Sequence, residues 1–203
     1  MLKSRFPELM RIFDLGIAQA LRIIGNEWAA GTRSIAQERR CTQKIMDALY
    51  GLRKPGSDHE PGTLPMALVG CAESCHHEAG SMFVRLMLEK NGWEVCYLGA
   101  DVPFHEYGAI QTEIKAELVA ISFVPPTVAA DARRCISILA SQYREDSPYY
   151  LTVGGSGLNG TPIETKGWPF LDVRVEREIE IFQNWARSKS KEFLNPKTRK
   201  GKK

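Results

Sequence analysis

Residues Gly70–Gly80 read GCAESCHHEAG and lie between two segments whose patterns predict different secondary structure. The preceding apolar run, residues 66–69 (MALV), has the length and composition of a buried strand. Residues 78–91 carry apolar side chains at helical spacing, namely Phe83, Leu86, Met87 and Leu88. His76 and His77 are therefore expected in a strand-to-helix loop beyond the carboxyl end of a strand, where open α/β sheets bind their ligands.

Segments typical of strands and helices alternate from residue 66 onward. Strands are predicted at residues 66–71, 93–98, 118–123 and 149–153, with a weak strand near 171–173. Helices are predicted at residues 78–91, 103–114, 128–143 and 176–186. This alternation predicts parallel βαβ units with right-handed crossovers. The expected fold class is α/β, a doubly wound parallel sheet of five strands.

The amino-terminal part of the chain predicts a helical hairpin. Residues 7–30 have a broad apolar face at helical spacing, residues 31–34 (GTRS) break the pattern, and Ser34 is the expected N-cap of a second helix that ends near Leu52. Two helices cannot enclose a core alone, so the hairpin must pack on something else. The predicted domains are a helical cap (1–56), a linker (57–65), an α/β domain (66–188) and a basic flexible tail (189–203).

The distribution of charge argues against nucleic-acid binding by the body of the chain. The net charge is +3, but residues 187–203 hold eight basic residues and one acidic residue, so the remainder is acidic. No apolar run approaches the roughly 20 residues of a membrane-spanning helix, and no signal peptide is recognised. The five cysteines are odd in number and scattered. A cytoplasmic protein without membrane contact is expected.

Small residues follow four of the predicted strands. They occur in residues 70–80, in Gly99-Ala100-Asp101, in Ser122 with Pro125-Pro126, and in Gly154-Gly155-Ser156-Gly157. Because the carboxyl ends of parallel strands meet at one edge, these loops predict a site that a large ligand approaches closely. The first loop lacks the G-x-G-x-x-G pattern of dinucleotide-binding proteins, and a Walker A loop is absent too.

The loops resemble those of the cobalamin-binding domain family, whose first strand is followed by D-x-H-x-x-G or E-x-H-x-x-G. Residues 75–80 (CHHEAG) match at the histidine and the glycine, and the family's later signatures appear in order as Ser122-Phe123-Val124 and Gly154-Gly155. The resemblance implies a flavodoxin-like fold that binds cobalamin with His77 as the lower axial ligand of cobalt. It also implies cofactor contacts at Glu73, Cys75, His76, Gly80, Gly99, Asp101, Val102, Ser122, Val124, Gly154 and Gly155.

The hairpin is similar to the cap bundle of adenosylcobalamin-dependent light-sensing regulators, which carries W-x9-E-H. Trp28 and Glu38 match this spacing, and the resemblance implies that they cover the upper face of the corrin near an adenosyl group. Half of the usual bundle and the upstream DNA-binding helices have no counterpart, so a regulator without a DNA-binding domain is expected. A second copy or a regulatory protein is the expected partner of the cap.

Two further departures from the family concern individual residues. Cys75 stands where the family has an acid that orients the ligand histidine, and a thiol is a weak acceptor. Glu73 would replace that acid only if the loop bends. Ala29 and Arg39 stand where the light sensors have upper-face histidines.

The expected function is a non-enzymatic sensor or regulatory module that binds adenosylcobalamin and responds to light. The alternatives are a corrinoid carrier in methyl transfer, or a degenerate module that binds haem through His77 or Cys75 or acts only as a protein-interaction surface. A zinc site from Cys71, Cys75, His76 and His77 is disfavoured because the ligands crowd one short loop. Nucleophilic catalysis by Cys75 is disfavoured because no orienting acid is recognised.

Overall fold

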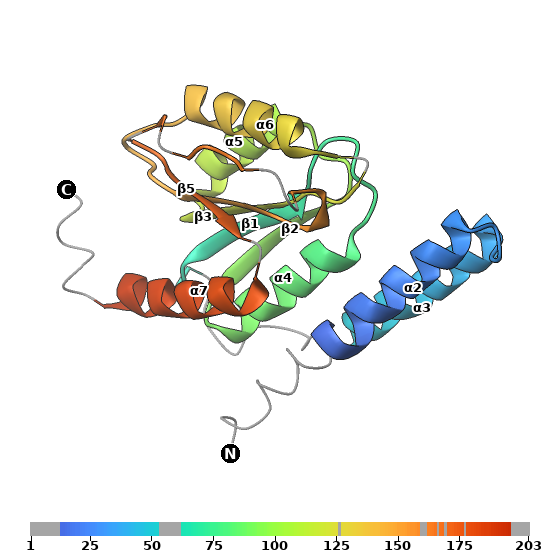
Figure 1. Ribbon diagram of the computed structural model, residues 1–203. Helices are drawn as coiled ribbons and strands as arrows, with labels where there is room; N and C mark the ends of the chain where they lie inside the picture. The colour runs from blue at the N-terminus through green and yellow to red at the C-terminus, as the bar shows by residue number, and fades with distance from the viewer. Residues whose placement is uncertain are drawn as a thin grey trace, which may run out of the picture. The chain divides into compact units, whose positions relative to one another are not determined.

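The chain forms two compact units, Met1–Pro55 and Gly56–Lys203, in a computed structural model (Figure 1). The structure describes residues 13–52, 62–125, 127–158, 162–165, 167–168, 170–176 and 178–195. Most of the predicted linker and the first residues of the predicted hairpin lie outside these ranges.

The second unit is built on a parallel sheet whose five strands are β1 (Met66–Cys71), β2 (Glu94–Gly99), β3 (Leu118–Ser122), β4 (Tyr150–Gly154) and β5 (Asp172–Glu176). The strand order is β2-β1-β3-β4-β5, and every neighbouring pair is parallel. This confirms the predicted doubly wound sheet. The chain leaves β1 for β2 on one side and returns to β3 on the other, so the topological switch point lies between β1 and β3.

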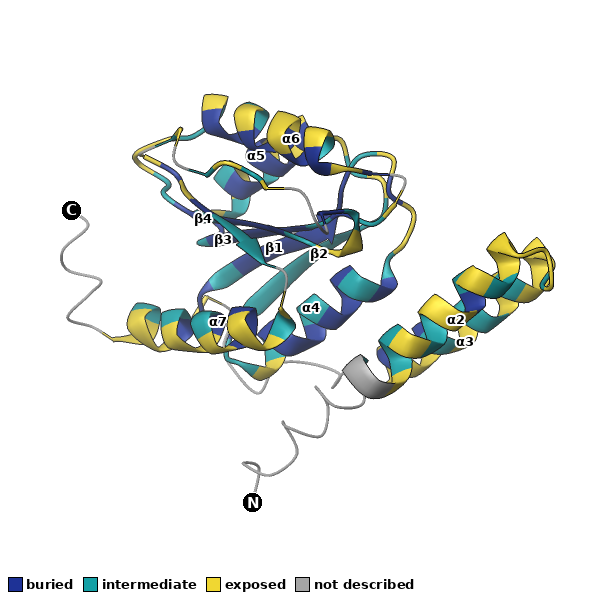
Figure 2. Cartoon of the chain, viewed as in Figure 1, coloured by how far each residue is buried: buried dark blue, intermediate teal, exposed yellow. Residues whose placement is uncertain are grey.

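Helices cover both faces of the sheet. Figure 1 shows α4 (Ala79–Lys90) and α7 (Ile179–Leu194) on one face, and α5 (Phe104–Ile114) and α6 (Ala129–Ser141) on the other. Between β4 and β5 the described residues contain only the short 3-10 turn η2 (Ser156–Leu158). The central strands β1 and β3 are almost wholly buried (Figure 2), which explains why they read as continuous apolar runs.

The first unit is a helical hairpin of α2 (Ala18–Ala29), which continues the π-helical turn η1 (Phe13–Ile17), and α3 (Ile35–Gly51). Ser34 is confirmed as the N-cap of α3: it donates its amide hydrogen to Gln37 Oε1 at 2.8 Å, while Ser34 Oγ accepts from the Gln37 amide at 3.3 Å. Arg33 donates from Nε to Glu27 Oε2 at 2.7 Å and so fixes the turn.

Helix α7 is longer than the sequence predicts. The predicted helix ends at Ala186 and the predicted flexible tail begins at residue 189, but α7 continues to Leu194, so the prediction is wrong for residues 189–194. The reason is packing: the Phe193 ring meets Trp93 edge-on at 5.8 Å and lies 6.3 Å from Tyr150. Ser190 Oγ also donates to the Asn91 carbonyl oxygen at 2.7 Å. The remaining tail residues, 196–203, lie outside the described ranges.

None of the helices in the described part of the chain is long and apolar enough to cross a membrane.

Replacing Phe193 by alanine tests this extension of α7. We expect Phe193→Ala to lower the free energy of unfolding by about 2 kcal/mol, because a half-buried ring that packs on two aromatic neighbours is lost. The adjacent Leu194 is exposed, so Leu194→Ala should change it by no more than about 0.5 kcal/mol. Urea denaturation measures both, and equal effects would contradict the packing described.

Candidate functional site

Hydrogen bonds turn the loop after β1 back on itself and hold it against the end of the neighbouring strand β3. The Ala72 amide donates to the Ser122 carbonyl oxygen at 2.9 Å, and the Cys75 amide donates to the Ala72 carbonyl oxygen at 3.0 Å. The turn that this closes holds Ser74 in the left-handed region, at φ +65°. The loop after β1 is therefore pinned to the end of β3 across the switch point.

Asp101 joins the loop after β1 to the loop after β2. Its Oδ1 accepts from the Ser74 amide at 2.7 Å, and its own amide donates to the Cys75 carbonyl oxygen at 3.0 Å. Asp101 itself has φ +53°, and the preceding Gly99 has φ +80°. Gly99 and Asp101, both predicted cofactor contacts, therefore set the backbone conformation of the loop after β2. Val102, the next predicted contact in that loop, is half-buried.

The turn buries Cys75 completely and leaves both histidines exposed. Cys75 has no exposed surface, whereas His76 and His77 are both exposed at the carboxyl edge of the sheet. The Cys71 thiol donates to the His77 carbonyl oxygen at 3.7 Å and lies 3.1 Å from Ser81 Oγ on α4. The backbone of His77 is thus tied to the end of β1.

Cys75 is a stronger hydrogen-bond acceptor than the sequence alone suggests. A hydrogen bond with the Cys71 thiol lowers the pKa of the Cys75 thiol against the opposing effect of burial, and hydrogen bonds with the His77 side chain and with the amides of His77 and Val124 lower it further. The pKa of Cys71 moves the opposite way, through the same hydrogen bond and through burial.

Glu73 does not replace the missing acid. Its carboxylate accepts two hydrogen bonds from Arg134 Nη2 on α6, at 3.1 and 3.2 Å. The Arg134 guanidinium lies over the Phe104 ring at 5.3 Å. Sequence reasoning missed Arg134 because an arginine on an exposed helical face carries no signal of a partner 61 residues away.

The loops after β3 and β4 approach each other closely. The Phe123 amide donates to the Gly154 carbonyl oxygen at 2.7 Å, and the Gly157 amide donates to the Phe123 carbonyl oxygen at 2.9 Å. A Cβ at Gly155, where φ is +111°, would lie 2.3 Å from that same Phe123 oxygen. The glycine at 155 is therefore required by the protein's own backbone.

A second close approach occurs between α4 and β3. A Cβ at Gly80, in the first turn of α4, would lie 3.5 Å from Ser122 Oγ at the end of β3. Thr152 lies on β4 with 4% of its surface exposed, and its hydroxyl has no hydrogen-bond partner among the described residues. Sequence reasoning did not select Thr152, since a threonine inside an apolar strand is ordinarily taken for a β-branched core residue.

The predicted cofactor contacts after residue 66 lie at one edge of the sheet, because each group stands at or just after the carboxyl end of a strand. The groups are Glu73 to Gly80 after β1, Gly99 to Val102 after β2, Ser122 to Val124 after β3 and Gly154-Gly155 after β4. Trp28 and Glu38 belong to the other unit. There Trp28 is 51% exposed, and Glu38 Oε1 accepts from Thr42 Oγ1 at 2.8 Å. In the described ranges no three His, Cys, Asp or Glu side chains come together to hold a metal ion.

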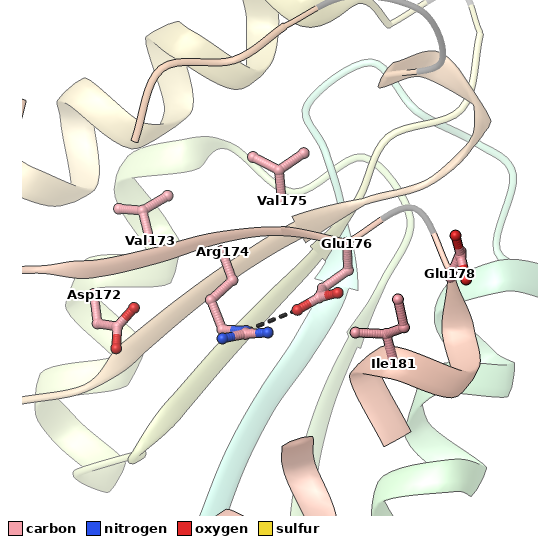
Figure 3. Close-up of a pocket in the computed structure, with 7 residues that line it drawn as sticks. All are labelled: Asp172, Val173, Arg174, Val175, Glu176, Glu178 and Ile181. Carbon is pink, nitrogen blue, oxygen red and sulfur yellow. Dashed lines mark hydrogen bonds and ion pairs between the residues drawn. The ribbon is translucent and has the colours of Figure 1, made fainter. Parts of the chain in front are cut away.

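A groove of about 430 Å³ follows β5 and the start of α7 (Figure 3). Its central charges pair with each other, since Arg174 Nε donates to Glu176 Oε1 at 2.7 Å. The Arg174 guanidinium also lies 4.7 Å from the Trp185 ring centre. None of the predicted site residues lines this groove.

Comparison with known proteins matches residues 65–182 to the B12 binding domain. The chain is 33% identical over 93 residues to the HTH-type transcriptional repressor CarA of Myxococcus xanthus, covering 46% of this chain and 31% of that protein. It is 28% identical over 149 residues to the repressor CarH of the same organism, covering 72% and 48%. The chain therefore spans about a third and about half of these two repressors.

Corrinoid proteins of Methanosarcina barkeri are similar as well. The dimethylamine corrinoid protein is 23% identical over 150 residues, with 73% of this chain and 70% of that protein covered. The solved monomethylamine corrinoid protein superimposes with a TM-score of 0.64 at 18% identity, over 92% of this chain and 87% of that one. This likeness confirms the flavodoxin-like fold. Since the family model covers more than half of the 203 residues, the chain belongs to the B12 binding domain family, and its cofactor is a cobalamin or a related corrinoid.

Proposed function

We propose that the protein is a regulatory module that binds adenosylcobalamin, with His77 as the lower ligand of cobalt in place of the cofactor's own base. The observation that carries the proposal is the loop after β1, which exposes the His77 ring at the switch point over a buried Cys75. Ligands of doubly wound sheets bind at that point. Only His77 has a glycine three residues later, at Gly80, as the family motif requires.

The residues present fit such a ligand. An exposed imidazole is a good donor to cobalt, and its second nitrogen needs a hydrogen-bond acceptor that fixes the ring and raises its basicity. Cys75, with its lowered pKa, supplies that acceptor. The small residues Gly80 and Ser122 face each other beside the loop, where a corrinoid's nucleotide tail would pass close to the backbone.

Each residue has a distinct task in this mechanism. His77 would hold the metal through one ring nitrogen and would keep its proton on the other, from which it would donate to Cys75 Sγ. Asp101 holds the loop through the Ser74 amide, so the loop backbone does not have to be ordered when the cofactor binds. When bound, adenosylcobalamin supplies a cobalt–carbon bond that light can cleave.

The hairpin supplies the regulatory part of the proposal. Trp28, half exposed on α2, and Glu38 on α3 have the spacing of the light-sensing regulators, and CarH aligns over 72% of this chain. We propose that Trp28 would cover the upper face of a bound corrin, in a contact that depends on the adenosyl group. A contact made in only one state shifts the population of hairpin conformations, and a second copy or a partner protein would detect the shift. The protein needs no catalytic residue for this role.

A corrinoid carrier in methyl transfer is the second candidate. The fold likeness to the monomethylamine corrinoid protein over 92% of the chain favours it. In that role the upper face would be open to other proteins, and Trp28 would not cover it.

Substitution of the two neighbouring histidines tests the ligand. His77→Ala should abolish the spectrum of a corrinoid with histidine as its lower ligand, because no other ring stands in register with Gly80. His76→Ala is the matched control: His76 is exposed as well, and its loss should leave the spectrum intact. Visible spectra of the reconstituted variants in darkness measure both. Loss of the spectrum only in His76→Ala would contradict the assignment.

Substitution of Cys75 tests the acceptor. Cys75→Ala should weaken cobalamin binding about tenfold, since partners of a metal-bound histidine commonly matter by that much. Cys75→Asp restores an acceptor and should bind at least as tightly as the unaltered protein. Cys96→Ala, on the edge strand β2, serves as the control. Titrations in darkness that show equal affinities for all four proteins would mean that another group orients the ring.

Illumination separates the two candidate functions. Green light should remove the adenosyl group and leave water above cobalt and His77 below, because Ala29 lacks a donor atom and Arg39 stays protonated. If the protein is a regulatory module, light should change its hydrodynamic radius or oligomeric state, and Trp28→Ala should abolish this change. An unchanged state would favour the carrier. His59 and His105 are the chain's other two histidines besides His76 and His77. A spectrum with histidine on both sides of cobalt that survives when His59 and His105 are both replaced by alanine would contradict the expected product.

A further inference from the structure

We propose that the outer edge of β5 is an interface between two copies of this chain. The two β5 strands pair antiparallel about a twofold axis and join the two parallel sheets into one continuous sheet. This inference goes beyond the proposed function and does not depend on it, because it concerns neither the cofactor nor the hairpin.

The first support is the unpaired edge of the sheet. The strand order ends at β5, and within the described ranges no strand pairs with its outer side. The ladder with β4 runs through all five residues of β5 without a bulge, and the strand contains neither proline nor lysine. Bulges, prolines and lysines are the usual devices that keep an edge strand from pairing with another chain. β5 therefore offers a regular strand to which a second strand can add.

The second support is the groove that follows this edge. All five residues of β5 line it, together with Glu178 and Ile181 from the start of α7 (Figure 3). Ile181 is apolar and yet 51% exposed. A strand that adds to β5 would run along this groove, so the hollow and its exposed apolar member mark the place of the occupant.

The third support is the arrangement of charge on β5. Val173 and Val175 pack with the core, while Asp172, Arg174 and Glu176 lie on the opposite side of the strand (Figure 3). The exposed Asp172 carboxylate has no ion pair or hydrogen bond among the described residues. Arg174 pairs with Glu176, but 30% of its side chain remains exposed. An acid without a partner thus stands two residues before a base that can still be reached.

This order of charges makes β5 complementary to itself. In an antiparallel pair about a twofold axis through Val173, residue 172 of each copy stands opposite residue 174 of the other. The Asp172 carboxylate of each copy then meets the Arg174 guanidinium of the other, so the ion pair forms twice, and two β-branched valines meet at the axis. Opposite charges and β-branched residues directly across an antiparallel pair stabilise it.

The other twofold registers oppose like charges. An axis through Arg174 would bring two arginines together at the centre. An axis through Val175 would place Asp172 opposite Glu178. Like charges directly opposite each other destabilise a strand pair, so charge selects the axis through Val173.

Two charge reversals and their mixture test this register. Asp172→Arg puts basic residues at both contacts of the dimer, and Arg174→Asp puts acids at both, so each variant alone should dimerise about tenfold more weakly than the unaltered protein. An equimolar mixture should recover the association, because a chain with two bases then meets a chain with two acids. Sedimentation equilibrium of the full chain in darkness measures all four samples, so the light-dependent change proposed for the hairpin does not enter.

Glu180→Arg is the matched control. It changes the net charge as Asp172→Arg does, and Glu180 is exposed on α7 but does not line the groove. This variant should dimerise like the unaltered protein. Melting temperatures show that the variants fold, which matters most for Arg174→Asp because it also loses the contacts of Arg174 with Glu176 and Trp185.

Cysteine cross-linking gives a second measurement that does not need the charge reversals. Under a mild oxidant, Asp172→Cys mixed with Arg174→Cys should form a disulfide between chains. Neither variant alone should do so, because equal positions are offset along the strands, beyond the reach of a disulfide.

Three results would overturn the inference. The unaltered protein remains monomeric up to about 1 mM, Asp172→Arg associates as strongly as the unaltered protein, or the cross-link forms in a single variant and not in the mixture. A mixture of folded charge variants that associates no better than its components would have the same meaning. The proposed function is untouched by these results, because cofactor binding is measured separately by the visible spectrum.

Discussion

The Ala72 amide bonds to the end of β3, and the Cys75 amide turns back to Ala72, so the chain cannot continue straight from β1 into α4. This turn buries Cys75 and leaves His77, two residues later, exposed. Asp101 locks it from the neighbouring loop through the Ser74 amide. The strand order β2-β1-β3-β4-β5 places this loop at the topological switch point between β1 and β3, where doubly wound sheets bind ligands.

Cys75 shows how a departure from a family motif can keep the chemistry of that motif. A thiol is a weak acceptor in water, but here the hydrogen bond with Cys71 and those with His77 and the Val124 amide lower the pKa of Cys75. A hydrogen-bonded sulfur thus stands behind the histidine loop where the family has a carboxylate. Glu73 is left to pair with Arg134 on α6, which ties the same loop to the opposite helical layer.

The sequence predicted the features that depend on neighbouring residues. The apolar runs of β1 and β3, the Ser34 N-cap and the His77 loop all follow from local patterns. It missed the end of α7 because Phe193 packs on Trp93 and Tyr150, which are distant in sequence, while its lysine-rich surroundings suggested a solvated tail. Thr152 was missed because an unsatisfied hydroxyl is recognisable only once its surroundings are folded.

The central claim is that a nitrogen of His77 binds cobalt from below, and electron paramagnetic resonance of the Co(II) form tests it most directly. The unpaired electron couples to the axial nitrogen, so the splitting reports that nitrogen's isotope. Protein grown with 15N-labelled histidine should change each cobalt line from a triplet to a doublet, and His77→Ala should lose the change. A triplet that persists with labelled histidine would show that the cofactor's own base remains on cobalt, which would contradict the account.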